Sequence, residues 1–117
     1  MRCFAEIWVV AHATEDLDVI ISTLKSAFGD LPYIIEPLVG HYGNPIYLIS
    51  AFTEDCSELL RKLCQELGGE LSSLQPSPAR EYFIRLDKQR LARGGFAVSN
   101  SDDVVKIRVR AERLCGQ

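Results

Sequence analysis

No apolar run in this 117-residue chain comes close to the roughly 18 residues that a membrane-spanning helix requires. Cys-x-x-Cys pairs are also missing, so we expect no structural metal and interpret the four cysteines as buried or incidental thiols. The first residues lack the pattern of a signal peptide. We therefore expect a cytoplasmic protein with no membrane association, no metal and no other cofactor.

The sequence also lacks internal repeats and linker-like segments. A chain of this length buries roughly two-thirds of its unfolded surface, which suffices for a core without metal or disulfide staples. Its hydrophobic fraction of 47% and charged fraction of 25% are average for a globular protein. We predict one domain over residues 1–117.

Charge is present, but it is shared unequally along the chain, although the net charge is only −3. Residues 1–78 hold four Lys and Arg against eleven Asp and Glu, whereas residues 79–117 hold nine against five. A basic C-terminal third on an acidic protein predicts a local anion-binding face.

Apolar periodicity predicts strands that alternate with helices. The segments with strand character are residues 3–11, 33–39, 46–52, 82–86 and 104–110. Helices are predicted from a cap at Thr14 to Phe28 and from Asp55 to a stop at Gly68-Gly69, with a short helical turn after Asp87. This order predicts an α+β, ferredoxin-like two-layer sandwich, with a mixed or antiparallel sheet, two main helices on one face and an open second face.

The last predicted strand places three cations on one face. Alternation sends its apolar residues to the core and leaves Lys106, Arg108 and Arg110 on the other side, about 6–7 Å apart, similar to successive phosphates on a single strand. Phe4 and Trp8 are expected on the same open face, and aromatic rings among cations suit unpaired bases and phosphates. An ordinary solvated strand face, a covering helix and a dimer interface are the alternatives.

The loop Gly40–Ile46 joins two predicted strands and carries more polar side chains than a turn needs. The glycines, Asn44 and Pro45 explain a reversal of the backbone, but His41 and Tyr42 are not required for it. One interpretation is a plain hairpin loop. The other is a tip that stacks Tyr42 on RNA and donates hydrogen bonds to it from His41 and Asn44.

His12-Ala13-Thr14 matches half of the motif of two-histidine phosphoesterases. Those enzymes need two facing copies, and His41 is followed by Tyr42-Gly43 instead of the second copy. We therefore expect no catalytic residues. A metal site would have ligands of suitable type in His12, His41, Glu15, Asp16 and Asp87, but a helix cap with hydrogen-bonded histidines is the preferred interpretation.

The polar clusters, in this order, resemble a small archaeal family of predicted exosome subunits or RNA-binding proteins. Its domain is similar to that of the ribosomal protein that binds 5S RNA. The matching segments are Ala11–Asp16, Gly40–Ile46, Arg85–Gln89 and Asp102–Val105, followed by Lys106, Arg108 and Arg110. The resemblance implies a ribosomal-protein-like α+β domain, RNA as the ligand and no catalysis. Arg90–Arg93 departs from it, since small apolar residues would be expected there.

The residues and the resemblance together predict a non-catalytic RNA-binding protein that serves RNA processing or degradation, with exosome or ribonucleoprotein components as partners. The residues expected to contact RNA are Lys106, Arg108, Arg110, Arg85, Lys88, His41, Tyr42, Asn44 and His12. Two alternatives stay open. One is a phosphoesterase that uses His12 and His41, and the other is a protein–protein adaptor or homodimer that associates through the aromatic sheet face.

Overall fold

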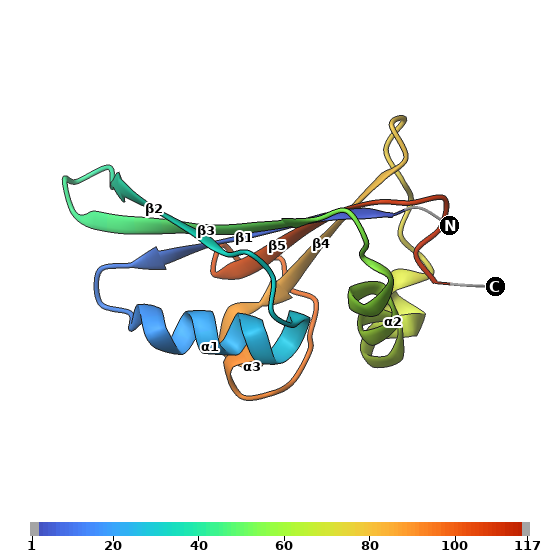
Figure 1. Cartoon of the computed structure of the whole chain (residues 1–117), viewed down its shortest axis with the longest axis horizontal. Helices are drawn as coiled ribbons and strands as arrows, with labels where there is room; N and C mark the ends of the chain where they lie inside the picture. The colour runs from blue at the N-terminus through green and yellow to red at the C-terminus, as the bar shows by residue number, and fades with distance from the viewer. Residues whose placement is uncertain (1–2, 116–117) are drawn as a thin grey trace.

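A computed structural model describes residues 3–115 and contains five strands and three helices within them (Figure 1). In chain order these are β1 (Phe4–His12), α1 (Leu17–Phe28), β2 (Ile34–Val39), β3 (Pro45–Thr53), α2 (Ser57–Leu71), β4 (Glu81–Asp87), α3 (Lys88–Ala92) and β5 (Val104–Arg110). The strands form one sheet, and all three helices lie on the same side of it. The predicted α+β two-layer architecture is confirmed.

The sheet has the strand order β2-β3-β1-β5-β4, and every neighbouring pair is antiparallel. In a plain ferredoxin-like sheet, the strand after the second helix would pair with β1. Here β5 pairs with β1 instead, and β4, the strand after α2, pairs with β5 at the edge of the sheet. The C-terminal strand is therefore flanked by β1 and β4, and its outward side chains meet those of both neighbours.

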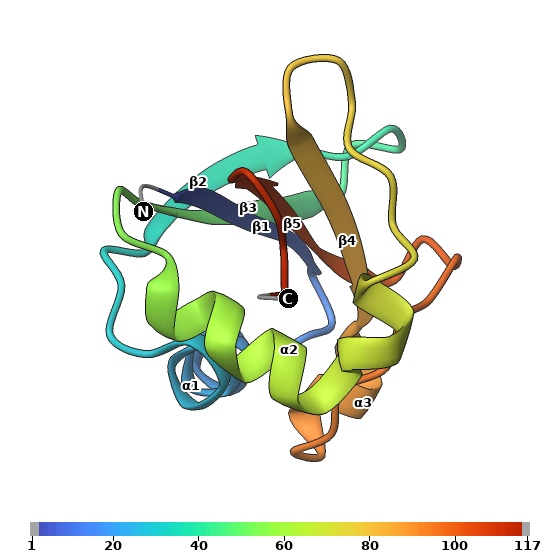
Figure 2. The same cartoon turned by 90° about the vertical axis from the view of Figure 1, so that its right-hand side faces the viewer.

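The core lies between the sheet and the helices. In β1, burial alternates strictly from Phe4 to Ala11, and the inward set of Ala5, Ile7, Val9 and Ala11 is almost fully buried. Helices α1 and α2 cover this side of the strands (Figure 2). Successive side chains of a strand point to opposite faces of the sheet. Every second side chain is therefore buried when helices cover only one face. Within residues 3–115, no helix combines the length and the apolar content needed to cross a membrane.

Two predicted helix boundaries were wrong. Asp16, rather than Thr14, caps α1, because its side chain accepts a hydrogen bond from the backbone N–H of Asp18 at 2.9 Å. Helix α2 does not stop at Gly68-Gly69 but runs on to Leu71 after a distortion at Leu67. Leu67 and Leu71 are both buried, so packing of their side chains carries the helix past the glycines.

The four cysteines are not free thiols. The structure pairs Cys3 with Cys56, the residue just before α2, and Cys64 of α2 with Cys115 near the end of the described residues. The expectation of buried or incidental thiols was therefore wrong. The partners are 53 and 51 residues apart in sequence, and only the tertiary fold brings them together.

The β2–β3 arm, which we define as Ile34–Thr53, extends beyond the end of β1 (Figure 1). Pairing between β1 and β3 ends at His12 and Ile46, so the loop at residues 40–44 lies past the last residue of β1. All six residues of β2 are exposed. The arm is thus an edge hairpin whose tip extends away from the helices.

Candidate nucleic-acid interface

The sheet face opposite the helices, which we call the open face, carries aromatic and charged side chains in cross-strand rows. One row consists of Ser50, Trp8, Lys106 and Arg85, and the next consists of Phe52, Glu6, Arg108 and Phe83. A third row at the end of the sheet consists of Phe4, Arg110 and Glu81. The predicted cations of β5 thus share a face with Phe4 and Trp8, and the described helices leave that face uncovered.

Lys106 and Arg110 are the exposed cations of β5. Within residues 3–115, neither side chain takes part in an ion pair. Lys106 lies between Trp8 and Arg85, and Arg110 lies between Phe4 and Glu81. Both positive charges are therefore available to an anionic ligand that lies along the open face.

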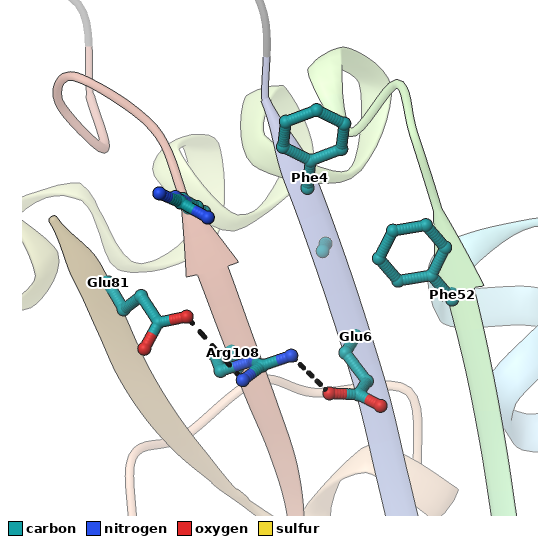
Figure 3. A pocket seen from close by; sticks show the side chains of 7 residues that line it. Phe4, Glu6, Phe52, Glu81 and Arg108 are labelled. Atoms are coloured by element: carbon teal, nitrogen blue, oxygen red, sulfur yellow. Dashed lines mark ion pairs between the residues drawn. The ribbon is translucent and has the colours of Figure 1, made fainter. Parts of the chain in front are cut away.

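Arg108 has a different environment. Its Nη2 lies 2.8 Å from Oε1 of Glu6, and its Nη1 lies 3.5 Å from Oε2 of Glu81 (Figure 3). Two carboxylates thus offset one guanidinium. The prediction that Arg108 contacts a phosphate needs correction, because its charge and two of its donor groups are already engaged.

Phe4 and Phe52 form a flat aromatic surface beside this ion-pair group, which we call the Phe4–Phe52 platform. Their ring centroids are 6.3 Å apart, their planes differ by 14°, and Figure 3 shows the rings side by side. Phe52 is 48% exposed. The platform and the ion-pair group line a shallow pocket of about 260 Å³, together with Arg110.

Lys88 is not on the open face but buried between three segments. Its Nζ donates to the carbonyl of Val10 at 2.9 Å and forms ion pairs with Glu15 at 2.8 Å and Asp103 at 2.9 Å. Its side chain is only 6% exposed. The prediction that Lys88 contacts RNA needs correction, because its side chain is buried and its three donors have protein partners.

The carboxylates around Lys88 have altered acidity. Burial raises the pKa of Glu15, but hydrogen bonds from the backbone N–H of His12 and from Lys88 outweigh it, so the pKa lies below its usual 4.5. The hydrogen bond from Lys88 lowers the pKa of Asp103 below its usual 3.8, against an opposing effect of burial. Both groups therefore stay ionised around the buried ammonium.

His12, Glu15 and Asp103 also bring three potential metal-ligand atoms within 4.8 Å of one another. The ammonium of Lys88 lies against both carboxylates of this group and already supplies their positive charge. A divalent cation would have to displace that lysine from a buried position. We therefore assign no metal to the cluster.

Arg85 connects the edge strand β4 to a turn. Its Nη2 donates to the carbonyl of Ser101 at 2.7 Å, and its Nε has no hydrogen-bond partner among the described residues. The side chain is half-buried, so only part of the guanidinium can reach a ligand. Arg85 is a weaker candidate for phosphate contact than its neighbour Lys106.

The tip of the β2–β3 arm presents Tyr42, which is 92% exposed, with the His41 ring packed edge-on against it at 4.8 Å. Asn44 folds over Gly40, where a Cβ would lie only 2.5 Å from the Asn44 side-chain oxygen. Gly43 has a φ of 80°, which favours glycine. The two glycines and Asn44 thus shape the loop, and the exposed rings remain free for contact.

The two histidines belong to different surroundings. His12 lies at the end of β1 beside Glu15 and Asp103, whereas His41 packs on Tyr42 at the tip of the arm. The two imidazoles therefore do not face each other as the histidines of two-histidine phosphoesterases do.

Sequence reasoning assigned no role at the interface to four residues of the open face, namely Glu6, Phe52, Glu81 and Phe83. Alternation in residues 46–52 would have placed Phe52 outward, because Ile49 and Ala51 face the core. The contacts of Glu6 and Glu81 with Arg108 depend on strand order and register, which the sequence alone does not reveal.

Comparison with known proteins agrees with this architecture. A family model described as RNA binding matches residues 5–111. The RNA-binding protein PAB1135 of Pyrococcus abyssi is 28% identical over 118 residues, which cover 86% of this chain and 76% of that protein.

Two solved structures share the fold. The DUF54 protein Mth689 from Methanothermobacter thermautotrophicus aligns with a TM-score of 0.83 at 21% identity, over 93% of this chain and 84% of that one. Protein AF2318 from Archaeglobus fulgidus, also DUF54, aligns with a TM-score of 0.77 at 23% identity, over 92% and 84% of the two chains.

Proposed function

The chain belongs to this RNA-binding family, and from that premise we propose that it binds unpaired RNA across the open face without catalysing a reaction. The observation that carries the proposal is the row arrangement, in which each exposed cation of β5 lies beside an aromatic residue of β1. Lys106 adjoins Trp8, and Arg110 adjoins Phe4. A single strand offers phosphates and base faces side by side, and such rows can engage both.

We assign phosphate contacts to Lys106 and Arg110. The two residues are four positions apart on one strand, so their bases lie about 13 Å apart, or two phosphate spacings of an extended strand. Trp8, Phe52 and Phe83 supply ring faces between and beside them, and Phe83 is 55% exposed. Stacking on such rings contributes about 1–3 kcal/mol per base and tolerates any sequence.

The tip of the β2–β3 arm forms a second contact in this proposal. Tyr42 stacks on a base, His41 and Asn44 donate hydrogen bonds, and His12 lies between the tip and the central rows. A bound strand would run from β5 across β1 towards the arm. We further propose a role in RNA processing or degradation, which rests on the resemblance of the polar clusters to predicted exosome subunits.

The salt dependence of RNA binding tests the phosphate contacts. A fluorescein-labelled oligouridine of 12 nucleotides is titrated with protein by fluorescence anisotropy at several salt concentrations. On a single strand, each phosphate that the protein neutralises contributes about 0.7 to the slope of log K against log[salt]. Lys106→Ala/Arg110→Ala should therefore flatten the slope by about 1.4.

The matched control is Lys25→Ala/Arg61→Ala, which removes the same charge from exposed positions of α1 and α2. Its slope should equal that of the wild type. Equal slopes for all three proteins would show that β5 is not part of the interface. Equal flattening in both variants would show that the change in slope follows net charge and not the position of the cations.

A further inference from the structure

The pocket between the Phe4–Phe52 platform and Arg108 has no net charge and includes two carboxylates in its lining. Arg108 and Arg110 contribute two positive charges, and Glu6 and Glu81 contribute two negative ones, which lie 2.8 and 3.5 Å from the Arg108 guanidinium. A phosphate oxygen in this place would meet the two carboxylates. A neutral ligand with hydrogen-bond donors would instead be attracted.

The platform adds a preference for a flat ring. Phe4 and Phe52 lie side by side with nearly parallel planes, and Glu6 is the direct cross-strand neighbour of Phe52 (Figure 3). Cross-strand neighbours have their Cβ atoms about 5 Å apart. A base stacked on Phe52 therefore brings one of its edges to the Glu6 carboxylate.

From these two observations we propose that this pocket binds an unpaired guanine, an inference that rests on the proposed function. Guanine presents two parallel donors on its Watson–Crick edge, N1–H and the 2-amino group, and a carboxylate can accept both. Uracil offers one N–H between two carbonyl acceptors. Adenine and cytosine set an acceptor nitrogen beside their amino group, which faces a carboxylate unfavourably.

Arg108 is a positioning residue in this assignment. Its Nη2 holds Oε1 of Glu6 at 2.8 Å, and an ionised carboxylate still has further lone pairs on both oxygens. The guanidinium thus fixes the direction of the carboxylate and leaves its acceptor capacity for the base. Glu81 balances the other side of Arg108 and is separated from Phe4 by Arg110.

The test compares nine-nucleotide oligouridines that carry guanine, adenine, cytosine or hypoxanthine at the centre. Affinity is measured by anisotropy at one salt concentration. A bidentate contact to a base edge is worth roughly 1–3 kcal/mol, so the guanine oligonucleotide should bind about tenfold or more tightly than oligouridine. Hypoxanthine lacks the 2-amino group and should lose most of that advantage.

Glu6→Gln replaces one acceptor oxygen by an amide donor and should abolish the guanine preference, so that this variant binds the guanine oligonucleotide and oligouridine with similar affinity. Glu81→Gln makes the same exchange on the other side of Arg108 and should keep the preference. Phe52→Leu should weaken binding of all five oligonucleotides to a similar extent.

Equal affinity of the wild type for all central bases, with RNA binding and its dependence on Lys106 and Arg110 intact, would overturn the guanine pocket alone. Loss of the preference in Glu81→Gln but not in Glu6→Gln would overturn the assignment to Glu6. Absence of binding to every oligonucleotide would instead overturn the proposed function, so the two failures are distinguishable.

Discussion

Lys88 connects three parts of the chain through one buried ammonium. It is the first residue of α3, and its Nζ contacts Val10 near the end of β1, Glu15 before α1 and Asp103 before β5. These segments are far apart in sequence but meet at one end of the helix layer. These contacts therefore fix how the chain leaves β1 and how it enters β5.

Lys88→Met should destabilise the fold, because it leaves two neighbouring carboxylates without their cation. Breaking a buried ion pair costs about 3–5 kcal/mol, and we expect the lower end of that range since Asp103 is 44% exposed. Urea unfolding at pH 7 measures the difference. Lys25→Met removes an exposed pair with Asp30 and should cost less than about 1 kcal/mol. Similar losses of stability in both variants would contradict the stabilising role assigned to the buried ion pairs of Lys88.

The stability difference between the wild type and Lys88→Met should depend on pH, because the pKa values of Glu15 and Asp103 are lowered in the folded state. A carboxyl whose pKa is lowered in the folded state adds stability above its unfolded pKa, and this stability is lost as the pH falls through the folded pKa. The advantage of wild type over Lys88→Met should thus be complete at pH 7 and shrink below the usual values of 4.5 and 3.8. A constant difference from pH 7 to 3 would contradict it.

At the scale of elements, β2 is an edge strand with exposed apolar residues, among them Ile35 and Val39. The hydrogen bond from the N–H of Gly40 to the carbonyl of Asn44 fixes the register of the hairpin. Alternation then directs the N–H groups of residues 34, 36 and 38 to β3, and those of residues 35 and 39 outward. Residue 37 also faces outward, but it is proline and has no N–H.

Pro37→Val should promote self-association, because it restores the central donor of an exposed apolar edge. Sedimentation velocity over a range of protein concentrations would reveal dimers or larger species in the variant. Pro78→Val, in the loop between α2 and β4, serves as the control and should sediment like the wild type. A monomeric Pro37→Val protein would show that the missing donor does not protect this edge.

The elements themselves were largely predictable, since local patterns determine them. Alternation in β1 and β5 sufficed to place Phe4, Trp8 and Lys106 on one face. The end of α2 was not predictable, because burial of Leu67 and Leu71 overrides the helix-ending tendency of Gly68-Gly69. Local preference decides an element until a tertiary contact outweighs it.

The site was less predictable than the fold. From the sequence alone, both Lys88, which follows a strand, and Arg108, which lies on an exposed strand face, were plausible phosphate contacts. Strand order then brings Glu6 and Glu81 to Arg108, and the turn before β5 brings Asp103 to Lys88. These carboxylates come from distant segments, so their effect on each cation emerges only in three dimensions.

At the scale of the whole molecule, the two faces of the sheet carry different kinds of side chain. One face carries the helices, the core and the buried Lys88 cluster. The other carries the cross-strand rows and continues into the β2–β3 arm. An acidic protein can bind a polyanion in this way, because the exposed Lys106 and Arg110 concentrate positive charge where aromatic rings are also available.

Ultraviolet crosslinking of the protein to a mixed-sequence single-stranded RNA, with the crosslinked residues mapped by mass spectrometry, tests the central claim most directly. Our account predicts crosslinks on the open face, at Phe4, Trp8, Phe52 and Phe83, and on Tyr42 at the tip of the arm. Crosslinks confined to residues of α1, α2 and α3, with none on these five aromatic residues, would contradict it.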